Sequence, residues 1–191
     1  MTTQESKRKL AAILSADVKG YSRLMSQDEE ATVKVLRQNR ATISGLVSEH
    51  RGRVVDSPGD NILAEFGSVV DAVKCAVKIQ EALKGKNAEL PENRRMEFRI
   101  GVNLGDVIEE EERIYGDGVN IAARLEGLAE AGGVTISGTA FDQVKNKISV
   151  GYQYLGKQTV KNISDPVRAY KVLMGPESAG KVIGETEPKP R

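Results

Sequence analysis

The sequence predicts an α+β fold with a ferredoxin-like βαββαβ core whose helices lie on one face of the sheet, and three observations support it. A short, continuously apolar run at residues 10–16 is followed by a capping-box sequence at residues 26–29 and a helical apolar stripe. Residues 53–66 place two apolar runs around the turn formers Asp-Ser-Pro-Gly-Asp-Asn, which predicts a β-hairpin. A second helix after Ser68 and an alternating strand at residues 96–107 complete the order strand, helix, hairpin, helix, strand.

The rest of the chain predicts additional C-terminal strands and a helix that decorate this core. The expected elements are an acidic loop or hairpin tip at residues 109–112, a helix after the glycine-bearing loop 115–118, a strand at 134–137, a short helix at 139–145, and strands at 152–160 and 167–173. We expect residues 1–9 to be flexible, residues 10–174 to form the only folded domain, and residues 175–191 to be a disordered tail or linker.

Composition restricts the class of protein without identifying it. A chain of 191 residues can bury one core, and its formal net charge of +1 gives no general attraction to nucleic acid or membrane. The single cysteine, Cys75, excludes an internal disulfide framework and suits a reducing compartment. No apolar run approaches the length of a membrane span, so the expected location is the cytoplasm.

Two aspartates are the candidate metal ligands. Asp17 ends the first predicted strand, and Asp60 lies in the turn of the hairpin. In a βαββαβ sheet the first strand lies beside the second strand of the hairpin, so the two carboxylates can meet. A hard divalent cation such as Mg²⁺ takes one or two carboxylates together with substrate phosphates. The alternative is that these are ordinary aspartates at a strand end and a turn, and their spacing alone favours that alternative.

Asn120 and Arg124 are candidates for contact with a phosphate or a nucleotide. They are four residues apart on a predicted helix, next to a glycine-bearing loop whose backbone N–H groups favour phosphate. A guanidinium suits charge that develops on a phosphoryl group. The alternative is a solvated arginine paired with Glu126 or Glu130. Lys161, at the last predicted turn, can reach a phosphate as a point charge, although most lysines at such turns only face solvent.

Four separated motifs together outweigh these individual alternatives. The runs ILSADVKGYSRL, GDNILAEFG, IYGDGVNIAARLE and TVKNISDPVRAYKV resemble the class III adenylate/guanylate (nucleotidyl) cyclase catalytic domain. The resemblance extends from about residue 10 to residue 173, with the motifs in the family's order and spacing. It implies an enzyme that converts ATP, or less commonly GTP, to the 3′,5′-cyclic nucleotide and pyrophosphate.

The resemblance also implies roles for individual residues. Asp17 and Asp60 match the two metal-binding aspartates, which hold two ions of Mg²⁺ or Mn²⁺ per site. Asn120 matches the asparagine that orients the ribose, Arg124 the arginine that stabilises the transition state, and Lys161 the lysine that binds the triphosphate. Where the family usually has Lys-Gly, this chain has Lys-Asn. The family works as a head-to-tail dimer, in which one chain supplies the metal ligands and its partner the nucleotide contacts.

The positions that read the base depart from the family patterns. The position four residues before the second metal aspartate, a lysine in adenylyl cyclases and a glutamate in guanylyl cyclases, is Asp56. The position seven residues before the asparagine, an aspartate or threonine in adenylyl cyclases, is Arg113. Hydrogen-bond donors and acceptors on these two side chains can be satisfied by adenine or by guanine, and the two can also pair with each other. We expect ATP because it is the commoner substrate among bacterial-looking relatives.

Three functions therefore compete. The first is an active cyclase in a homodimer, with a regulatory domain outside this chain. The second is a catalytically weak or inactive cyclase-homology domain that binds nucleotide or dimerises without turnover, which the departures at Asp56, Arg113 and Asn162 motivate. The third is another palm-type phosphoryl-transfer enzyme such as a diguanylate cyclase, but the GGDEF-like turn of that class is missing.

Overall fold

The computed structural model describes residues 6–55 and 60–184 of the chain, and its elements follow the predicted order. The βαββαβ core consists of β1 (Lys7–Val18), α1 (Tyr21–Gln27), α2 (Glu29–Glu49), β2 (Gly52–Val55), β3 (Ile62–Phe66), α3 (Val69–Ala88) and β4 (Phe98–Glu110). The remaining elements are η1 (Glu92–Arg94), β5 (Arg113–Tyr115), α4 (Asp117–Leu128), β6 (Val134–Ser137), α5 (Gly138–Val144), β7 (Gly151–Gln158), β8 (Val167–Leu173), η2 (Pro176–Ser178) and β9 (Val182–Ile183).

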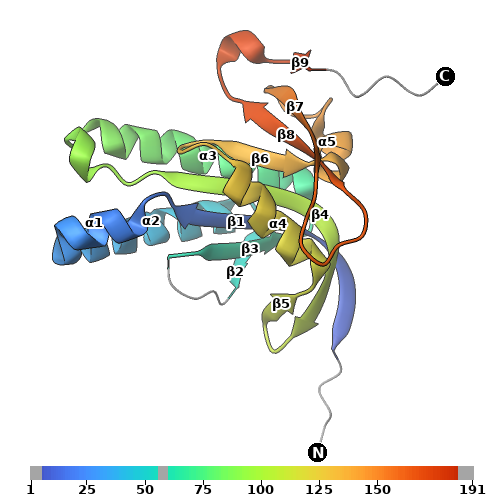
Figure 1. The fold of residues 1–191 in the computed structure, drawn as a ribbon, viewed down its shortest axis with the longest axis horizontal. Helices are drawn as coiled ribbons and strands as arrows, with labels where there is room; N and C mark the ends of the chain where they lie inside the picture. The colour runs from blue at the N-terminus through green and yellow to red at the C-terminus, as the bar shows by residue number, and fades with distance from the viewer. Residues whose placement is uncertain (1–5, 56–59, 185–191) are drawn as a thin grey trace, which may run out of the picture.

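All strands of the described residues join one sheet in the order β2-β3-β1-β4-β6-β8-β7-β9, and β5 pairs with β4 outside this path (Figure 1). Strand β1 lies between β3 and β4 and is antiparallel to both. The registers pair Ala16 with Ile62 and Asp17 with Arg99. The end of β1 therefore lies beside the start of β3, as the βαββαβ topology predicts.

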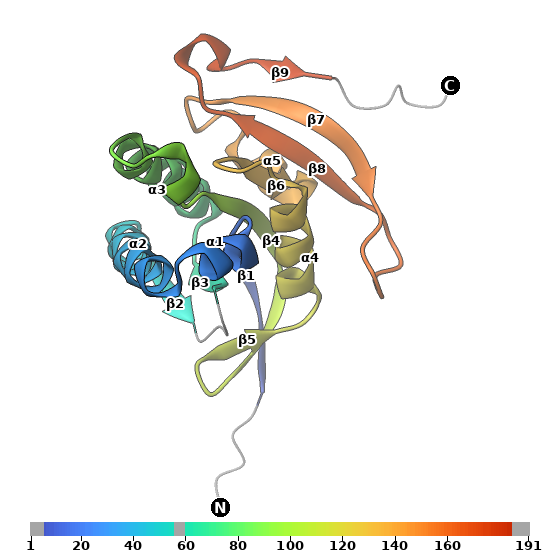
Figure 2. The ribbon, with the colours of Figure 1, turned by 60° about the vertical axis from the view of Figure 1, so that its left-hand side comes forward.

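The two faces of the sheet are covered by different helices. Ala12, Leu14 and Ala16 of β1 face the main core, which also contains side chains of α2, α3 and α5. Alternate residues Ala11 and Ile13 face a smaller apolar cluster on the opposite side, where α4 packs. Figure 2 shows α2 and α3 on one side of β1 and β4, with α4 on the other. The helices of the core thus share one face, as predicted, and α4 covers the other.

Helix α4 approaches the sheet more closely than side chains on both partners would permit. A Cβ atom added at Gly101 of β4 would overlap the backbone of Ala122 and Glu126, and one added at Gly118 of α4 would overlap the carbonyl of Asp106. The side-chain amide of Asn103 donates to the Gly118 carbonyl at 3.0 Å. Glycine is needed here for close backbone approach, and it fixes the position of α4 over β1 and β4.

The structure differs from the sequence predictions at several boundaries. Asp28, not Ser26, caps the long helix, because its side chain accepts a hydrogen bond from the Ala31 amide at 3.1 Å, whereas the Ser26 hydroxyl donates to the Ser22 carbonyl. The preceding residues form the separate helix α1. Strand β1 begins at Lys7, inside the segment expected to be flexible, because residues 7–9 pair with β4.

The segment expected to be a disordered tail also contains regular structure. Residues 176–178 form η2, and β9 pairs in parallel with β7. No helix within the described residues combines the length and the apolar composition that a bilayer span requires.

Candidate active site

The structure brings Asp17 and Asp60 together. Asp17 is the penultimate residue of β1, and Asp60 lies just before β3, the neighbouring strand. The Oδ2 atom of Asp60 accepts a hydrogen bond from the Val18 amide at 3.1 Å, so its carboxylate is fixed against the residue that follows Asp17. Two aspartates 43 positions apart in the sequence therefore meet at one end of the sheet.

Arg99 is the counter-ion of this pair. It is the cross-strand partner of Asp17 on β4, and its Nε and Nη2 atoms donate to Oδ1 and Oδ2 of Asp17 at 3.1 and 3.0 Å. The hydrogen bonds that Arg99 donates to Asp17, together with the charges of Asp17, Glu126 and Asp60, raise the pKa of Arg99. Both carboxylate oxygens of Asp17 are thus engaged by one guanidinium.

A third carboxyl group is buried between α4 and the sheet, next to the segments that carry the two aspartates. Glu126 of α4 is only 6% exposed, and its Oε1 atom accepts hydrogen bonds from the Ser15 hydroxyl at 3.2 Å and from the Asn61 side-chain amide at 3.1 Å. The Asn61 amide also donates to the Ser15 hydroxyl at 3.3 Å. Burial, and then the negative charge of Asp17, raise the pKa of Glu126 to about 8.

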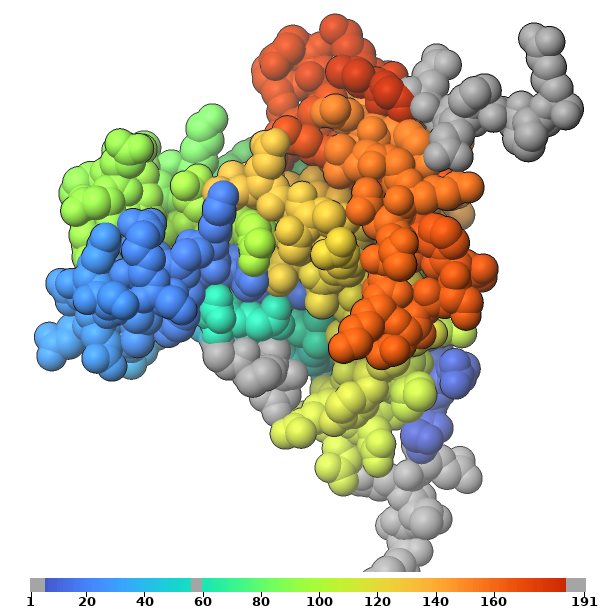
Figure 3. Space-filling view, viewed as in Figure 1, coloured from blue at the N-terminus to red at the C-terminus, as the bar shows by residue number. Residues whose placement is uncertain are grey.

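Asn120 and Arg124 lie on the exposed face of α4. The alternative ion pairs of Arg124 do not form, because Glu126 turns toward the sheet and Glu130 pairs with Lys171 at 3.0 Å. Residues 124 and 126 are two apart on a helix, so their side chains point about 160° apart, on nearly opposite sides of the helix. Within one chain, the face with Asn120 and Arg124 therefore points away from the two aspartates. Figure 3 shows this face of the molecule, with α4 near its centre.

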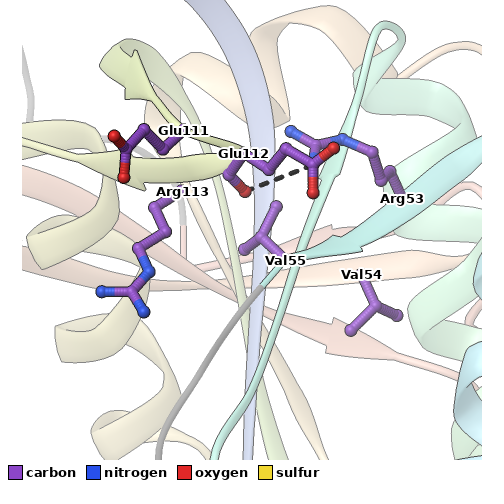
Figure 4. A pocket seen from close by; sticks show the side chains of 6 residues that line it. All are labelled: Arg53, Val54, Val55, Glu111, Glu112 and Arg113. Atoms are coloured by element: carbon purple, nitrogen blue, oxygen red, sulfur yellow. Dashed lines mark hydrogen bonds between the residues drawn. The ribbon is translucent and has the colours of Figure 1, made fainter.

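Lys161 and Arg113 lie away from the aspartate pair. Lys161 is exposed in the turn between β7 and β8. Arg113 is exposed on β5 and lines a pocket of about 350 Å³ together with Arg53, Val54, Val55, Glu111 and Glu112 (Figure 4). The Arg53 guanidinium donates to the Glu112 carbonyl at 3.2 Å across this pocket. Asp56, the proposed partner of Arg113 in reading the base, lies outside the described residues.

Asp17 and Asp60 have the chemistry for a hard divalent cation. Their carboxylate oxygens are the ligands that Mg²⁺ and Mn²⁺ prefer, and two carboxylates suit a site that substrate phosphates complete. Within residues 6–55 and 60–184, no group of three or more His, Cys, Asp or Glu residues has the arrangement of a metal site formed by protein alone. The two carboxylates leave coordination positions of such a cation that the phosphates of a bound substrate can fill.

Sequence reasoning missed four residues around the aspartates: Ser15, Asn61, Arg99 and Glu126. Ser15 shares a strand face with Asp17, and Asn61 directly follows Asp60, so both positions carried a local signal. Arg99 becomes visible only with the register of β1 against β4. The sequence indicates Glu126 only as a partner for Arg124, because the burial of Glu126 depends on the packing of α4 against the sheet.

Comparison with known proteins identifies the family of the chain. The family model of the adenylate and guanylate cyclase catalytic domain matches residues 3–174. The chain is 44% identical over 171 residues to a putative adenylate cyclase 3 of Rhizobium meliloti, covering 89% of this chain but 29% of that relative.

Two solved structures show the same fold. An adenylate/guanylate cyclase/hydrolase from Silicibacter pomeroyi superposes with a TM-score of 0.83 at 36% identity, covering 88% of this chain and 99% of that one. The adenylyl cyclase CyaB from P. aeruginosa, at 24% identity, superposes with a TM-score of 0.77 over 92% of this chain and 100% of that one. The predicted fold class is confirmed, and the chain belongs to the adenylate and guanylate cyclase catalytic domain family.

Proposed function

We propose that this chain converts ATP to 3′,5′-cyclic AMP and pyrophosphate in a site shared by two copies of the chain. The observation that carries the proposal is the meeting of Asp17 and Asp60, with the Asp60 carboxylate held by the Val18 amide. Residues 10–174 are the proposed catalytic domain. Because the chain spans 29% of the length of its Rhizobium relative, we also propose that a regulatory domain belongs to the full protein. The proposed location is the cytoplasm, where ATP and Mg²⁺ are available.

Each candidate residue has a separate role in the proposed reaction. Asp17 and Asp60 would hold two ions of Mg²⁺ or Mn²⁺, which when bound favour the 3′-alkoxide and neutralise phosphate charge. Asn120 orients the ribose, and Lys161 binds the triphosphate. The 3′-oxygen loses its proton to solvent and forms a bond to the α-phosphorus, while the bond from that phosphorus to the bridging oxygen breaks and pyrophosphate leaves. Arg124 stabilises the charge that develops on the α-phosphate, a contribution typically worth roughly 3–4 kcal/mol.

The opposite orientations on α4 favour a shared site. The Asn120 and Arg124 face points away from Asp17 and Asp60 of the same chain, whereas a head-to-tail partner can present that face to them. In such a homodimer each chain gives its aspartates to one site and its α4 face to the other.

ATP is the preferred substrate in this proposal, and GTP is the alternative. The Rhizobium relative is named a putative adenylate cyclase, and the Silicibacter structure is described as an adenylate/guanylate cyclase/hydrolase. Arg113 lines the pocket next to residue 55, and we propose that it reads the base together with Asp56. Both substrates leave the donors and acceptors of these two residues satisfied, so the preference rests on the relatives.

The test is a product assay with ATP and GTP side by side in the presence of Mn²⁺. We expect cyclic AMP from the wild-type chain and a loss of at least about a hundredfold in Asp60→Ala, because the metal would lose one of its two protein ligands. Equal absence of product from both proteins contradicts catalysis. Saturable nucleotide binding without product would support the alternative, a nucleotide-binding or dimerisation module.

Mixing two inactive variants tests the shared site. Asp60→Ala removes a metal ligand, and Arg124→Ala removes a nucleotide contact, so each homodimer has two defective sites. A mixed head-to-tail dimer has one site with both defects and one intact site, so random mixing should restore about a quarter of the wild-type activity. No recovery in a mixture that forms heterodimers contradicts the head-to-tail arrangement.

A further inference from the structure

Glu126 occupies an unusual position relative to the proposed catalytic residues. Its helix carries Asn120 and Arg124 on the exposed face, while Glu126 itself is buried against the sheet. Its Oε1 atom accepts hydrogen bonds from Ser15, two residues before Asp17, and from Asn61, the residue after Asp60. One carboxyl oxygen is thus connected to both segments that carry the candidate metal ligands.

The segment around Asp60 depends on such contacts for its position. The Asn61 side chain is held by Ser15 and Glu126, and its backbone carbonyl accepts from the Arg40 guanidinium of α2 at 3.3 Å. In the same segment, the Asp60 carboxylate accepts a hydrogen bond from the Val18 amide. Through the Asn61 side chain, α4 can therefore influence the orientation of the neighbouring Asp60 carboxylate.

Contacts other than those of Glu126 also attach α4 to the sheet. Close backbone contacts at Gly101 and Gly118 already hold the helix, as does the apolar cluster that includes Ile13 and Ala122. An apolar residue at position 126 would bury more apolar surface at less desolvation cost than a carboxyl group. The buried carboxyl group is thus better explained by what it holds than by helix packing.

We propose that Glu126, acting through Ser15 and Asn61, is a positioning residue that orients Asp17 and Asp60 for divalent-cation binding. This inference rests on the proposed function, because it assigns the cation to these two aspartates. It also gives one chain a physical connection between the metal ligands of one site and the α4 face that serves the other site. Residues that orient metal ligands through hydrogen bonds typically change metal affinity by about 10- to 100-fold when they are removed.

The test measures Mn²⁺ binding to the purified chain by water-proton relaxation enhancement, without nucleotide and without turnover. In Glu126→Ala we expect the dissociation constant for Mn²⁺ to rise by about 10- to 100-fold. In Glu126→Gln we expect it to stay within about threefold of wild type, because the amide oxygen can still accept from Ser15 and Asn61. Glu130→Ala, which removes an exposed carboxylate near the end of the same helix, should leave it unchanged.

Two further variants separate the possible outcomes. Asp60→Asn should abolish the site, and Mn²⁺ binding that survives it contradicts the metal assignment itself and this inference with it. If Asp60→Asn abolishes binding but Glu126→Ala binds as wild type does, only the inference about Glu126 is wrong. Ser15→Ala removes one hydrogen bond and retains the carboxyl group, so it reports on the same network if Glu126→Ala does not fold. A severalfold weaker Mn²⁺ affinity in Ser15→Ala supports the inference, and unchanged affinity overturns it.

Discussion

Two groups of charged side chains lie on the same face of the sheet, one at each end of β1, and they differ in charge balance. At the start of β1, Lys9 and Arg53 face Glu65 and Glu109, so two cations meet two carboxylates; we call these four residues the balanced cluster. At the end of β1, the single guanidinium of Arg99 faces the carboxyl groups of Asp17, Asp60 and Glu126; we call these four residues the acidic cluster.

The pKa shifts follow this difference. The hydrogen bond from Lys9 lowers the pKa of Glu109, as expected for a carboxylate with its own cation. Burial and the charge of Asp17 raise the pKa of Glu126, against the smaller opposing effect of the Arg99 charge. The balanced cluster therefore contains equal numbers of cations and carboxylates, whereas in the acidic cluster three carboxyl groups share one cation. Repulsion among the carboxyl groups of the acidic cluster lowers the stability of the fold, and a bound cation would relieve that repulsion.

Removing a carboxylate from the balanced cluster should have the largest effect on stability. The Glu65 side chain is 10% exposed, and its carboxylate pairs with Lys9 at 3.1 Å and accepts from the Arg53 Nε at 3.0 Å. In Glu65→Ala we expect the free energy of unfolding to fall by about 2–3 kcal/mol in urea titrations, because two cations lose their shared partner but remain partly solvated.

A matched control for Glu65→Ala is Asp142→Ala, which breaks a more exposed ion pair with Arg168. It should cost less than about 1 kcal/mol. Mn²⁺ binding should be unchanged in both variants. A stability loss for Glu65→Ala as small as that of the control would mean that the balanced cluster is not a stabilising feature.

The sequence predicts the two aspartates of the acidic cluster but neither its arginine nor its glutamate, and it predicts none of the balanced cluster. Asp17 and Asp60 could be placed together because the order of elements fixes β1 beside β3, and each aspartate follows or precedes a recognisable apolar run. Lys9 lies in the segment expected to be flexible, and Glu65 lies in one of the two apolar runs of the predicted hairpin. Their pairing depends on the registers of three strands, which local patterns do not specify.

The same distinction explains which parts of the fold were predictable. The element order and the apolar faces follow from periodicity within short segments, and these predictions are confirmed. The caps and ends of helices depend on single hydrogen bonds, such as the one from the Ala31 amide to Asp28. Several neighbouring polar side chains can make such a bond, so the sequence does not show which of them caps the helix. The burial of the Glu126 side chain depends on contact between α4 and residues more than 60 positions earlier in the sequence. No local sequence pattern can therefore predict it.

Removing the positive charge of Arg99 should strengthen cation binding by the acidic cluster. Its guanidinium occupies both oxygens of Asp17 and repels an arriving cation. In Arg99→Gln we expect Mn²⁺ to bind about tenfold more tightly, measured by relaxation enhancement. Arg168→Gln breaks another arginine–aspartate pair far from the cluster and should leave Mn²⁺ binding unchanged. Weaker binding in Arg99→Gln would instead mean that the arginine holds Asp17 in its binding orientation.

Neutralising one aspartate should give the smallest change, with a sign opposite to that in the balanced cluster. In Asp60→Asn the side-chain oxygen can still accept from the Val18 amide, while one negative charge beside Asp17 and Glu126 disappears. With metal removed by a chelator, we expect the free energy of unfolding to rise by about 1 kcal/mol. Asp142→Asn, whose aspartate is balanced by Arg168, should be neutral or slightly destabilising.

Salt distinguishes the cause of that gain. Repulsion among partly exposed charges weakens as the Debye length falls from about 10 Å at 0.1 M to about 3 Å at 1 M salt. If excess negative charge is the cause, the stability gain of Asp60→Asn should shrink at 1 M salt and added Mn²⁺ should stabilise only the wild type. A gain that is independent of salt would assign the effect to hydrogen bonding, and the contrast between the two clusters would then not be one of charge.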